Sequence, residues 1–343
     1  MKRLSLFCEL CVLCVLCVAF VRLAQAPPAR ALAAAPQQTV VLYCSADQDF
    51  AEPIVKEFEK QTGIRVLARY DTEATKTVGL VQRLRSEAVK PSADVFWSGE
   101  IFHTIRLARE GLLAGTPVPD KWPGPADAKG RWCGFALRAR VIAYNTNRVK
   151  PADAPRKLED LLDAKWKGRI VLAQPQFGTT GGDVASWFAH YGSQRGRKIL
   201  EALKANQVRL VQANSTAVRA VAQGEADLCF TDTDDIYAAQ REKWPVAMNY
   251  EMQGDDGVLV IPNTVAVVKG APHAEAARKL AAYLLSPAVE EALAKSDAHN
   301  TPVDPATAAK FPQYAIPKPL KIDYEAVSDK LDEAIAASRE VFR

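Results

Sequence analysis

The chain has 343 residues, of which 48% are hydrophobic and 24% are charged, with 44 basic and 40 acidic side chains. These values fit a globular protein of about two domains and exclude collagen-like, coiled-coil and broadly disordered chains. Four basic residues but only one acidic residue precede residue 34, so the remainder carries a net charge of +1. Such a body lacks the clustered lysine and arginine that a phosphate backbone requires, and we therefore expect no nucleic-acid partner.

The N-terminal segment has the order of an export signal. The pair Lys2-Arg3 precedes an apolar run from Leu4 to Val21, and small residues follow up to Ala33. Glu9 interrupts the apolar run, which argues against a permanent membrane span. The sequence therefore predicts a signal peptide over residues 1–33 and a periplasmic mature protein.

The seven cysteines fall into two groups. Four of them repeat as C-x-x-C inside the apolar run, namely Cys8, Cys11, Cys14 and Cys17. We expect no metal there, because an apolar signal helix does not form the folded thiolate cage that zinc requires. The other three are Cys44, Cys133 and Cys229. Three thiols allow at most one disulfide, and the sequence leaves open whether two of them pair or all are buried as small apolar side chains.

In the rest of the chain, apolar strands alternate with amphipathic helices, a pattern typical of an α/β fold with a largely parallel sheet. The strands are predicted at residues 39–44, 65–70, 93–97, 169–172, 208–211 and 226–231. Apolar residues at helical spacing follow the first three strands, in stripes that begin at Phe50, Val78 and Ile101. Proline and glycine concentrate between Gly115 and Gly134, which predicts a surface loop.

Two longer apolar runs, Phe135 to Tyr144 and Val258 to Val268, flank an α/β block from about Pro151 to Tyr250. We infer that the chain crosses to a second lobe along the first run and returns along the second. The predicted architecture is therefore two lobes with a cleft between them. Lobe 1 is predicted to comprise residues 34–140 and 258–343, and lobe 2 residues 141–257.

The chain carries none of the common catalytic or phosphate-binding signatures: G-x-S-x-G, H-E-x-x-H, G-x-G-x-x-G and G-x-x-x-x-G-K-[ST] are all absent. It has only four histidines, and no two of them have a metal-ligand spacing on one helix face. We therefore expect a binding protein rather than an enzyme. The rival hypothesis is a secreted hydrolase that acts through Asp232 or Glu100.

Short polar residues stand where the predicted strands give way to helices. Ligands of open α/β sheets bind at the carboxyl ends of the strands, where helix N-termini expose free backbone N–H groups. The candidates at five such junctions are Ser45, Asp47, Ser98, Glu100, Thr179, Thr180, Asn214, Asp232 and Asp234. The alternative for each junction alone is plain helix capping, and the spacings Ser45 to Gln48 and Thr180 to Asp183 are those of capping motifs.

The sign of the ligand's charge stays open at this point. Hydroxyl groups and helix N-termini favour an anion, whereas carboxylates supply the oxygen ligands of a hard metal ion. Arg138 and Arg140 share one face of a strand, and either could pair with an anion. Glu73 and Lys76 stand three residues apart, which favours an ion pair within a helix.

Five segments place the chain in a known family: Val41–Tyr43, Thr62–Val66, Ala93–Trp97, Arg138–Thr146 and Gly178–Thr180. With these segments in this order, the chain from about residue 40 to residue 293 resembles the iron(III)-type periplasmic solute-binding proteins of ABC importers. The resemblance implies two α/β lobes joined by two crossover strands and a ligand captured by hinge closure. It also implies delivery to a permease in the inner membrane, without catalysis.

Iron-binding members place a ligand after the first strand, a glutamate after the third and adjacent tyrosines in the second lobe. The corresponding residues here are Asp47 or Gln48, Glu100 and the segment Thr231–Asp234, which has no tyrosine pair. The resemblance thus implies iron(III) or an iron complex as cargo, with a companion anion beside Arg140. The metal-ligand candidates are Asp47, Glu100, Asp232 and Asp234. The alternative is a small organic anion or zwitterion, phosphonate-like or thiamine-like. We expect a monomer with no resident cofactor.

Overall fold

The computed structural model describes residues 38–71 and 76–343, so the predicted signal peptide and its four cysteines lie outside the described residues. The strands are β1 (Thr39–Cys44), β2 (Arg65–Tyr70), β3 (Val95–Ser98), β4 (Cys133–Asn145), β5 (Ile170–Ala173), β6 (Arg209–Val211), β7 (Leu228–Asp232), β8 (Val246–Tyr250), β9 (Met252–Gln253), β10 (Gly257–Val258) and β11 (Val260–Val267). The α-helices are α2 (Gln48–Thr62), α3 (Val78–Ser86), α4 (Phe102–Arg109), α5 (Gly178–Tyr191), α6 (Ser193–Ala205), α7 (Asn214–Ala222), α8 (Thr233–Arg241), α9 (Ala274–Leu284), α10 (Pro287–Lys295), α11 (Pro305–Ala308) and α12 (Tyr324–Val341). Short 3-10 helices lie at Leu158–Leu162, Ala164–Trp166 and Pro312–Tyr314.

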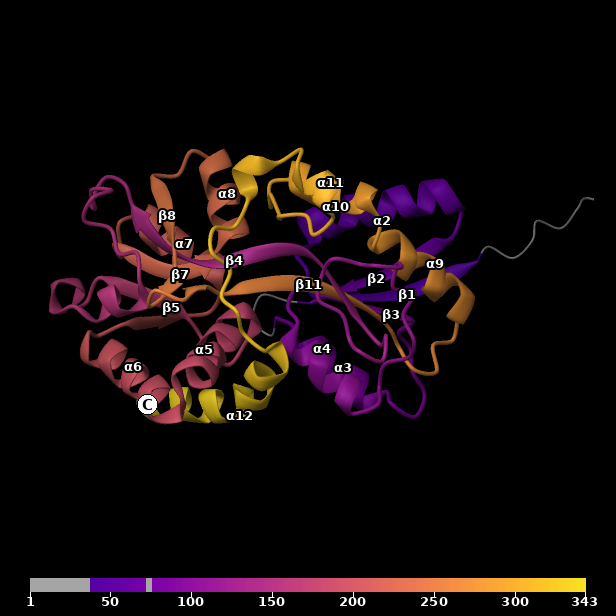
Figure 1. Ribbon diagram of the computed structural model, residues 1–343, viewed down its shortest axis with the longest axis horizontal. Coiled ribbons are helices and arrows are strands. Elements are labelled where there is room, and N and C mark those ends of the chain that lie inside the picture. The colour runs from indigo at the N-terminus through magenta and orange to yellow at the C-terminus, as the bar shows by residue number, and fades with distance from the viewer. Residues whose placement is uncertain (1–37, 72–75) are drawn as a thin grey trace, which may run out of the picture. The chain divides into compact units, whose positions relative to one another are not determined.

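The described strands form a mixed sheet in the order β2-β1-β3-β11-β4-β7-β5-β6, with β8 also paired to β4. Pairing is parallel from β1 to β2 and β3, and from β5 to β6 and β7. The long strands β4 and β11 pair antiparallel with each other and with their outer neighbours. Figure 1 shows them side by side between the two halves of the sheet. They correspond to the two apolar runs expected to cross between lobes.

Strand β4 belongs to both halves of the sheet. It pairs with β11 up to Ala139 and with β7 from Arg140 onward. The predicted lobe boundary falls at this change of partner, but the boundary itself stays a prediction.

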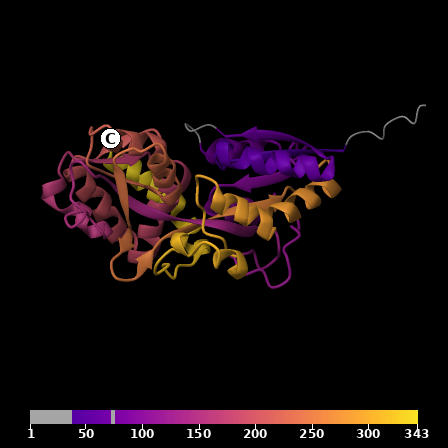
Figure 2. The ribbon, with the colours of Figure 1, turned by 90° about the horizontal axis from the view of Figure 1, so that it is seen from above.

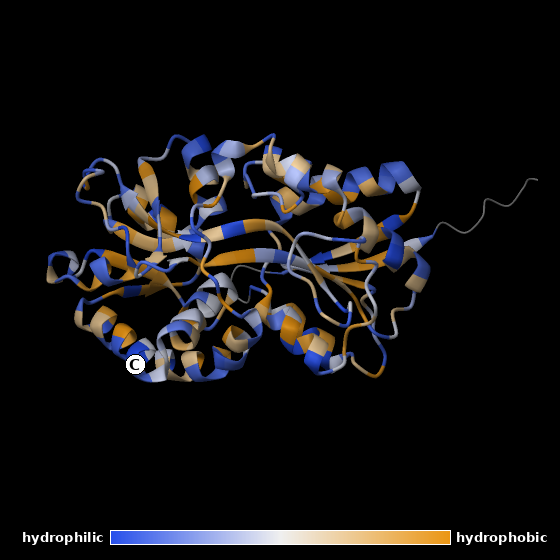
Figure 3. Ribbon diagram, viewed as in Figure 1, coloured by the Kyte–Doolittle hydropathy of each residue, from blue (hydrophilic) through white to orange (hydrophobic). Residues whose placement is uncertain are grey.

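Successive residues of the first-half strands face opposite sides of the sheet, as the pleat of a strand requires. Leu42 and Trp97 pack with residues of α2 and α9 on one side. Tyr43 and Phe96 belong to a second core with α3 and α4 on the other side, and this core continues into α5, α6 and α12. Figure 2 shows the helices on both sides of the strands, and Figure 3 shows apolar residues dominating the central strands. In the described part of the chain, no helix combines the length and apolar character needed to cross a membrane.

The C-terminal helix α12 is attached to both halves of the sheet. Arg106 of α4 donates to Asp332 at 2.6 Å, and Arg109 of α4 forms an ion pair with Glu325 at 2.5 Å. At the other end of α12, Arg197 of α6 donates to Glu340 at 2.9 Å. The predicted boundaries assign α12 to lobe 1. The helix packs against α4 of that lobe and also along α5 and α6, so its assignment to one lobe stays a prediction.

Helices α4 and α5 approach closely at Gly182, where a Cβ atom would overlap the ring of the buried Phe102. We therefore expect Gly182→Ala to lower the free energy of unfolding by about 1–3 kcal/mol, the usual cost of overpacking a core. Urea unfolding measures this difference. Gly115→Ala is the matched control, because a Cβ there has no heavy atom within 4 Å. Equal destabilisation by the two changes would contradict the close approach.

Both capping motifs expected from the sequence are wrong. The residue that precedes α2 is Asp47, whose side chain makes no cap. Ser45 does not cap α2 either, and its hydroxyl instead accepts from the backbone N–H of Gly99 at 3.0 Å. Helix α5 begins at Gly178, so Thr180 and Asp183 lie inside the helix, and Asp183 pairs with Arg140. In each case a partner distant in sequence takes the group that local spacing had assigned to a cap.

The cysteines left open by the sequence are Cys44, Cys133 and Cys229, and all three are free and buried. Burial raises the pKa of the Cys133 thiol to about 12 and that of the other two still further. These thiols are therefore protonated and unreactive at neutral pH.

Candidate ligand-binding site

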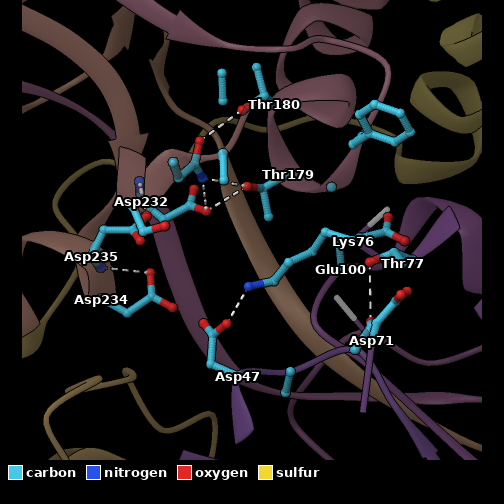
Figure 4. Close-up of a pocket in the computed structure, with 18 of the residues that line it drawn as sticks. Asp47, Asp71, Lys76, Thr77, Glu100, Thr179, Thr180, Asp232, Asp234 and Asp235 are labelled. Carbon is cyan, nitrogen blue, oxygen red and sulfur yellow. Dashed lines mark hydrogen bonds and ion pairs between the residues drawn. The ribbon is translucent and has the colours of Figure 1, made fainter. Parts of the chain in front are cut away.

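A pocket of about 410 Å³ lies at the carboxyl ends of the parallel strands, between the two halves of the sheet. Eight of the ten residues predicted from the sequence line it: Ser45, Asp47, Glu100, Thr179, Thr180, Asn214, Asp232 and Asp234. Figure 4 shows ten of the lining residues labelled, five from each half of the sheet. The shared location follows from sheet geometry. The carboxyl ends of β1 and β3 meet at one edge of the first half and those of β5, β6 and β7 at one edge of the second half, and the residues that follow them line the pocket from both sides.

The remaining two predicted residues, Ser98 and Arg140, do not line the pocket. Ser98 is buried behind it, where its hydroxyl accepts from the backbone N–H of Glu100 at 3.3 Å. Arg140 is fully buried and donates to Asp232 at 2.8 Å and to Asp183 at 3.0 Å. Both residues support lining residues instead of facing the pocket.

Three aspartates gather on one wall of the pocket, at the end of β7 and the start of α8. Asp232, Asp234 and Asp235 each offer a carboxylate oxygen, and these oxygens lie within 4.8 Å of one another. Burial raises the pKa of Asp235 to about 8, with Asp234 and Asp232 adding to the effect. Burial also raises the pKa of Asp234, although Arg138 opposes it. At neutral pH this wall therefore holds at least one proton.

Asp232 is the most firmly held of the three. Its carboxylate accepts from Arg140 at 2.8 Å, from the Thr179 hydroxyl at 2.5 Å and from the Asn214 amide at 3.1 Å. Burial acts to raise its pKa, but Arg140 and then Arg138 outweigh burial and keep the pKa below its usual range. Asp232 is therefore a fixed anionic group of the pocket.

Two cationic side chains enter the pocket and neutralise its other carboxylates. Lys76 forms an ion pair with Asp47, which Figure 4 shows as the lysine extending toward the aspartate. For Asp47, burial acts to raise the pKa, but Lys76 and then Arg138 outweigh it and the pKa is lowered. Arg138 donates to Asp234 at 2.6 Å and to the carbonyl oxygen of Gly99. Three of the carboxylates that could ligate a metal, those of Asp47, Asp232 and Asp234, are thus already paired with cations.

Two predictions concern these cations. The arginine that lines the pocket is Arg138, so Arg140 was the wrong choice of the two as the residue facing an anion. The sequence pattern identified Arg138 and Arg140 equally as candidates for pairing with an anion, since they share one strand face. It could not show that Arg140 is enclosed by Asp183 and Asp232. Glu73, the expected partner of Lys76, lies outside the described residues.

Glu100 lines the pocket, but its carboxylate is occupied by the first turn of α4. One oxygen accepts from the backbone N–H groups of Phe102 at 2.6 Å and His103 at 3.2 Å, and the other lies 3.1 Å from the His103 ring nitrogen. Neither tyrosine nor histidine is found among the described residues that line the pocket. The groups that can contact a cargo are therefore carboxylates, hydroxyls, amides and the backbone N–H groups at the N-termini of α5 and α7.

The N-terminus of α5 forms the hydroxyl-rich wall of the pocket. Gly178 has a φ of +54° and lies against the alkyl part of Lys76. The Thr180 hydroxyl donates to Asn214 at 3.0 Å, which links the first turns of α5 and α7. Backbone N–H groups in first turns have no partner within the helix, so this wall suits an anionic group.

We expect Arg140→Ala to act on stability before it acts on binding. The change leaves Asp183 and Asp232 buried without their shared counter-ion, which should lower the free energy of unfolding by about 3–5 kcal/mol. Urea unfolding measures the loss. Arg197→Ala, which breaks an exposed pair with Glu340, is the control and should cost about 0–1 kcal/mol. Similar values for the two variants would show that the buried pairing contributes little.

Comparison with known proteins identifies the family. Residues 90–326 match the bacterial extracellular solute-binding protein family, and the chain belongs to it. Iron uptake protein A1 of Synechocystis sp. is 30% identical over 279 residues, which are 76% of this chain and 75% of that protein. A Salmonella typhimurium periplasmic protein named for 2-aminoethylphosphonate binding is 31% identical over 234 residues, 67% of each chain. Both matches extend over most of the length of the relative.

Among solved structures, iron-bound HitA from Pseudomonas aeruginosa is similar, with a TM-score of 0.76 at 28% identity over 89% of this chain and 99% of that one. The predicted fold of two α/β lobes joined by two crossover strands is thereby confirmed. The resemblance to extracellular solute-binding proteins is confirmed as well. The protein is a solute-binding protein, and the pocket between the two halves of the sheet is its candidate binding site.

Proposed function

We propose that the protein captures ferric iron in the periplasm and delivers it to the permease of an ABC importer in the inner membrane. The observation that carries the proposal is the set of carboxylates on both sides of the pocket: Asp47 on one side, and Asp232, Asp234 and Asp235 on the other. Oxygen ligands of this kind suit a hard cation. The names of the Synechocystis relative and of the HitA structure, both of which refer to iron, support this choice of cargo.

The charge pairing in the pocket supports a cargo that consists of iron and an anion together. A cation that binds Asp47 and Asp234 must displace Lys76 and Arg138 from them. The displacement leaves positive charge beside these carboxylates, close to the first turn of α5, and a companion anion would help to balance it. Because Asp235 holds a proton at neutral pH, ligation through it would also release that proton.

The proposed metal ligands are Asp47, Asp232 and Asp234, as predicted, with Asp235 added. Glu100 is the weakest of the predicted ligands, because the first turn of α4 already occupies its carboxylate. The same occupation counts against Glu100 as a hydrolytic acid, and the contacts of Asp232 with Arg140 and Thr179 count against Asp232 in that role. We therefore propose that a monomer binds its cargo without chemical change and needs no resident cofactor.

A small zwitterion is the second candidate cargo. The specific observation in its favour is that the pocket places cations and carboxylates together: Lys76 and Arg138 beside the first turn of α5 could hold an anionic phosphonate, while Asp47 could hold an amine. The Salmonella relative named for 2-aminoethylphosphonate binding supports this candidate. A thiamine-like ligand has less support, since no aromatic ring except Phe50 and Phe177 lines the pocket among the described residues.

Native mass spectrometry with metal analysis of protein purified from the exported fraction separates the two candidates. One iron per chain supports the first proposal, and a metal-free organic adduct supports the second. Titration calorimetry with ferric citrate and with 2-aminoethylphosphonate then tests each cargo directly. Failure to bind either probe would contradict both proposals.

A further inference from the structure

Behind the pocket wall, the guanidinium of Arg140 is buried together with three carboxyl groups, two of which pair with it. Asp232 and Asp183 accept from it, as described, and the third group is Glu251, whose backbone N–H donates to the Arg140 carbonyl oxygen at 3.2 Å. Glu251 lies between β8 and β9, on the segment that leads back toward the crossover strand β11. All four side chains are at most 1% exposed.

The hydrogen bonds around Arg140 leave several polar atoms without a partner among the described residues. They include both carboxyl oxygens of Glu251, one oxygen of Asp183, one terminal nitrogen of Arg140 and the indole nitrogen of Trp187, which interacts with Glu251. Arg138 also lies 4.0 Å from Asp232, but its close partner is Asp234. Three ionised carboxylates beside Arg140 would therefore still bury an uncompensated negative charge, which costs several kcal/mol. At least one of the three carboxyl groups is therefore neutral.

Glu251 is the group best placed to carry the proton. Asp232 is kept ionised by Arg140 and Arg138. Asp183 already gives one oxygen to Arg140, and its second oxygen can accept a hydrogen bond. A neutral Glu251 has an O–H group to donate, whereas an ionised Glu251 would have two acceptors and no donor.

We propose that Glu251 is held as a neutral acid that donates a hydrogen bond to Asp183, and that this pair positions Arg140 and, through it, the pocket carboxylate of Asp232. Glu251 is thus a positioning residue that does not touch the cargo. The part of the inference that concerns cargo affinity rests on the proposed function, whereas the state of Glu251 does not.

The electrostatic surroundings agree with this assignment. Burial raises the pKa of Glu251 well above its usual range, the facing Asp183 adds to the effect, and Arg140 opposes it. The pKa of Asp183 is also raised, first by burial, with Arg140 opposing. Glu251 also interacts electrostatically with Tyr191 of α5, and this interaction contributes to a raised pKa of the tyrosine. A neutral Glu251 stabilises the fold below its unfolded pKa, and that stability is lost as the pH rises through the higher folded pKa.

The test compares Glu251→Gln and Glu251→Ala with the intact protein. Glutamine keeps the size and the donor of a neutral glutamic acid but cannot ionise. We expect Glu251→Gln to abolish one protonated-carboxyl band in the infrared difference spectrum at neutral pH. The melting temperature of wild type should decline as the pH rises from the unfolded pKa of a glutamate toward its higher folded pKa, and Glu251→Gln should lose part of this decline. The exposed Glu242→Gln is the matched control and should change neither readout.

Affinity for ferric citrate tests the positioning role. Glu251→Ala should bind at least tenfold more weakly than wild type, and Glu251→Gln should restore most of that loss. The inference is overturned if the infrared band is unchanged in Glu251→Gln, or if glutamine weakens binding as much as alanine does. If wild type itself does not bind ferric citrate, the proposed function fails, while the infrared and melting measurements still decide the state of Glu251.

Discussion

Replacing Asp234 with asparagine should lower the affinity for ferric citrate at least 100-fold while the protein still folds. Asp234 lies on the wall where three carboxylate oxygens meet, and an amide gives a metal ion no negative charge there. The loss should exceed the roughly 10- to 100-fold cost of removing a residue that only orients a ligand. Titration calorimetry, together with the iron content of the purified variant, measures the effect.

Asp234 is a better position than Asp232 for this test. Asp232 is held by Arg140, Thr179 and Asn214. Arg138, the partner of Asp234, also donates to the carbonyl oxygen of Gly99 and keeps that contact in the variant. In an Asp232→Asn, Asp234→Asn double variant, a loss of iron would therefore be mixed with a loss of stability. Asp153→Asn removes an exposed carboxylate far from the pocket lining and serves as the control. Equal iron content in wild type and in Asp234→Asn would remove this wall from the metal site.

Replacing Lys76 with methionine should weaken binding of ferric citrate by about 10- to 150-fold, equivalent to the 1.5–3 kcal/mol of a charge-assisted hydrogen bond. The reason is that Lys76 is the cation that would turn from Asp47 to the companion anion. Lys76→Arg keeps the positive charge and is the matched control, with a loss smaller than that of methionine. A methionine variant that binds as tightly as wild type would exclude Lys76 from anion binding.

The same variant has an expected pH signature. Lys76 is the main group that lowers the pKa of Asp47 against the effect of burial. Asp47 therefore stays ionised in wild type as the pH falls, until the pH reaches its lowered pKa. Without Lys76 the pKa rises, so iron affinity should begin to fall at a higher pH on acidification. Calorimetry over an acidic pH series would detect the difference.

Much of the site could be predicted from the sequence, because one geometric rule governs it. Ser45, Glu100, Thr179, Asn214 and Asp232 stand at the carboxyl ends of five different strands. In each half of the sheet, the carboxyl ends of the parallel strands meet at the edge that borders the pocket. Local patterns also predicted the first two strands with the bounds that the structure has. These features depend on residue spacing alone.

The features that were missed depend on partners distant in sequence. Arg140 and Arg138 look alike on their strand. Arg140 is distinguished by its ion pair with Asp183, 43 residues away in α5, which holds it behind the pocket wall. The hydroxyl of Ser45 was assigned to a cap because Gly99, 54 residues away, could not be placed beside it. Glu251 gave no signal at all, since an isolated glutamate near a strand end is ordinary in sequence.

Helix α12 has a consequence for the thermodynamics of cargo capture. It is fixed to α4 at one end and to α6 at the other, and β4 and β11 also join the two halves of the sheet. Three connections hold the walls of the pocket near each other before any cargo arrives, so most of their translational and rotational freedom is lost on folding. Capture then requires little further ordering of the chain, so less of the free energy of the charged contacts is spent on ordering it.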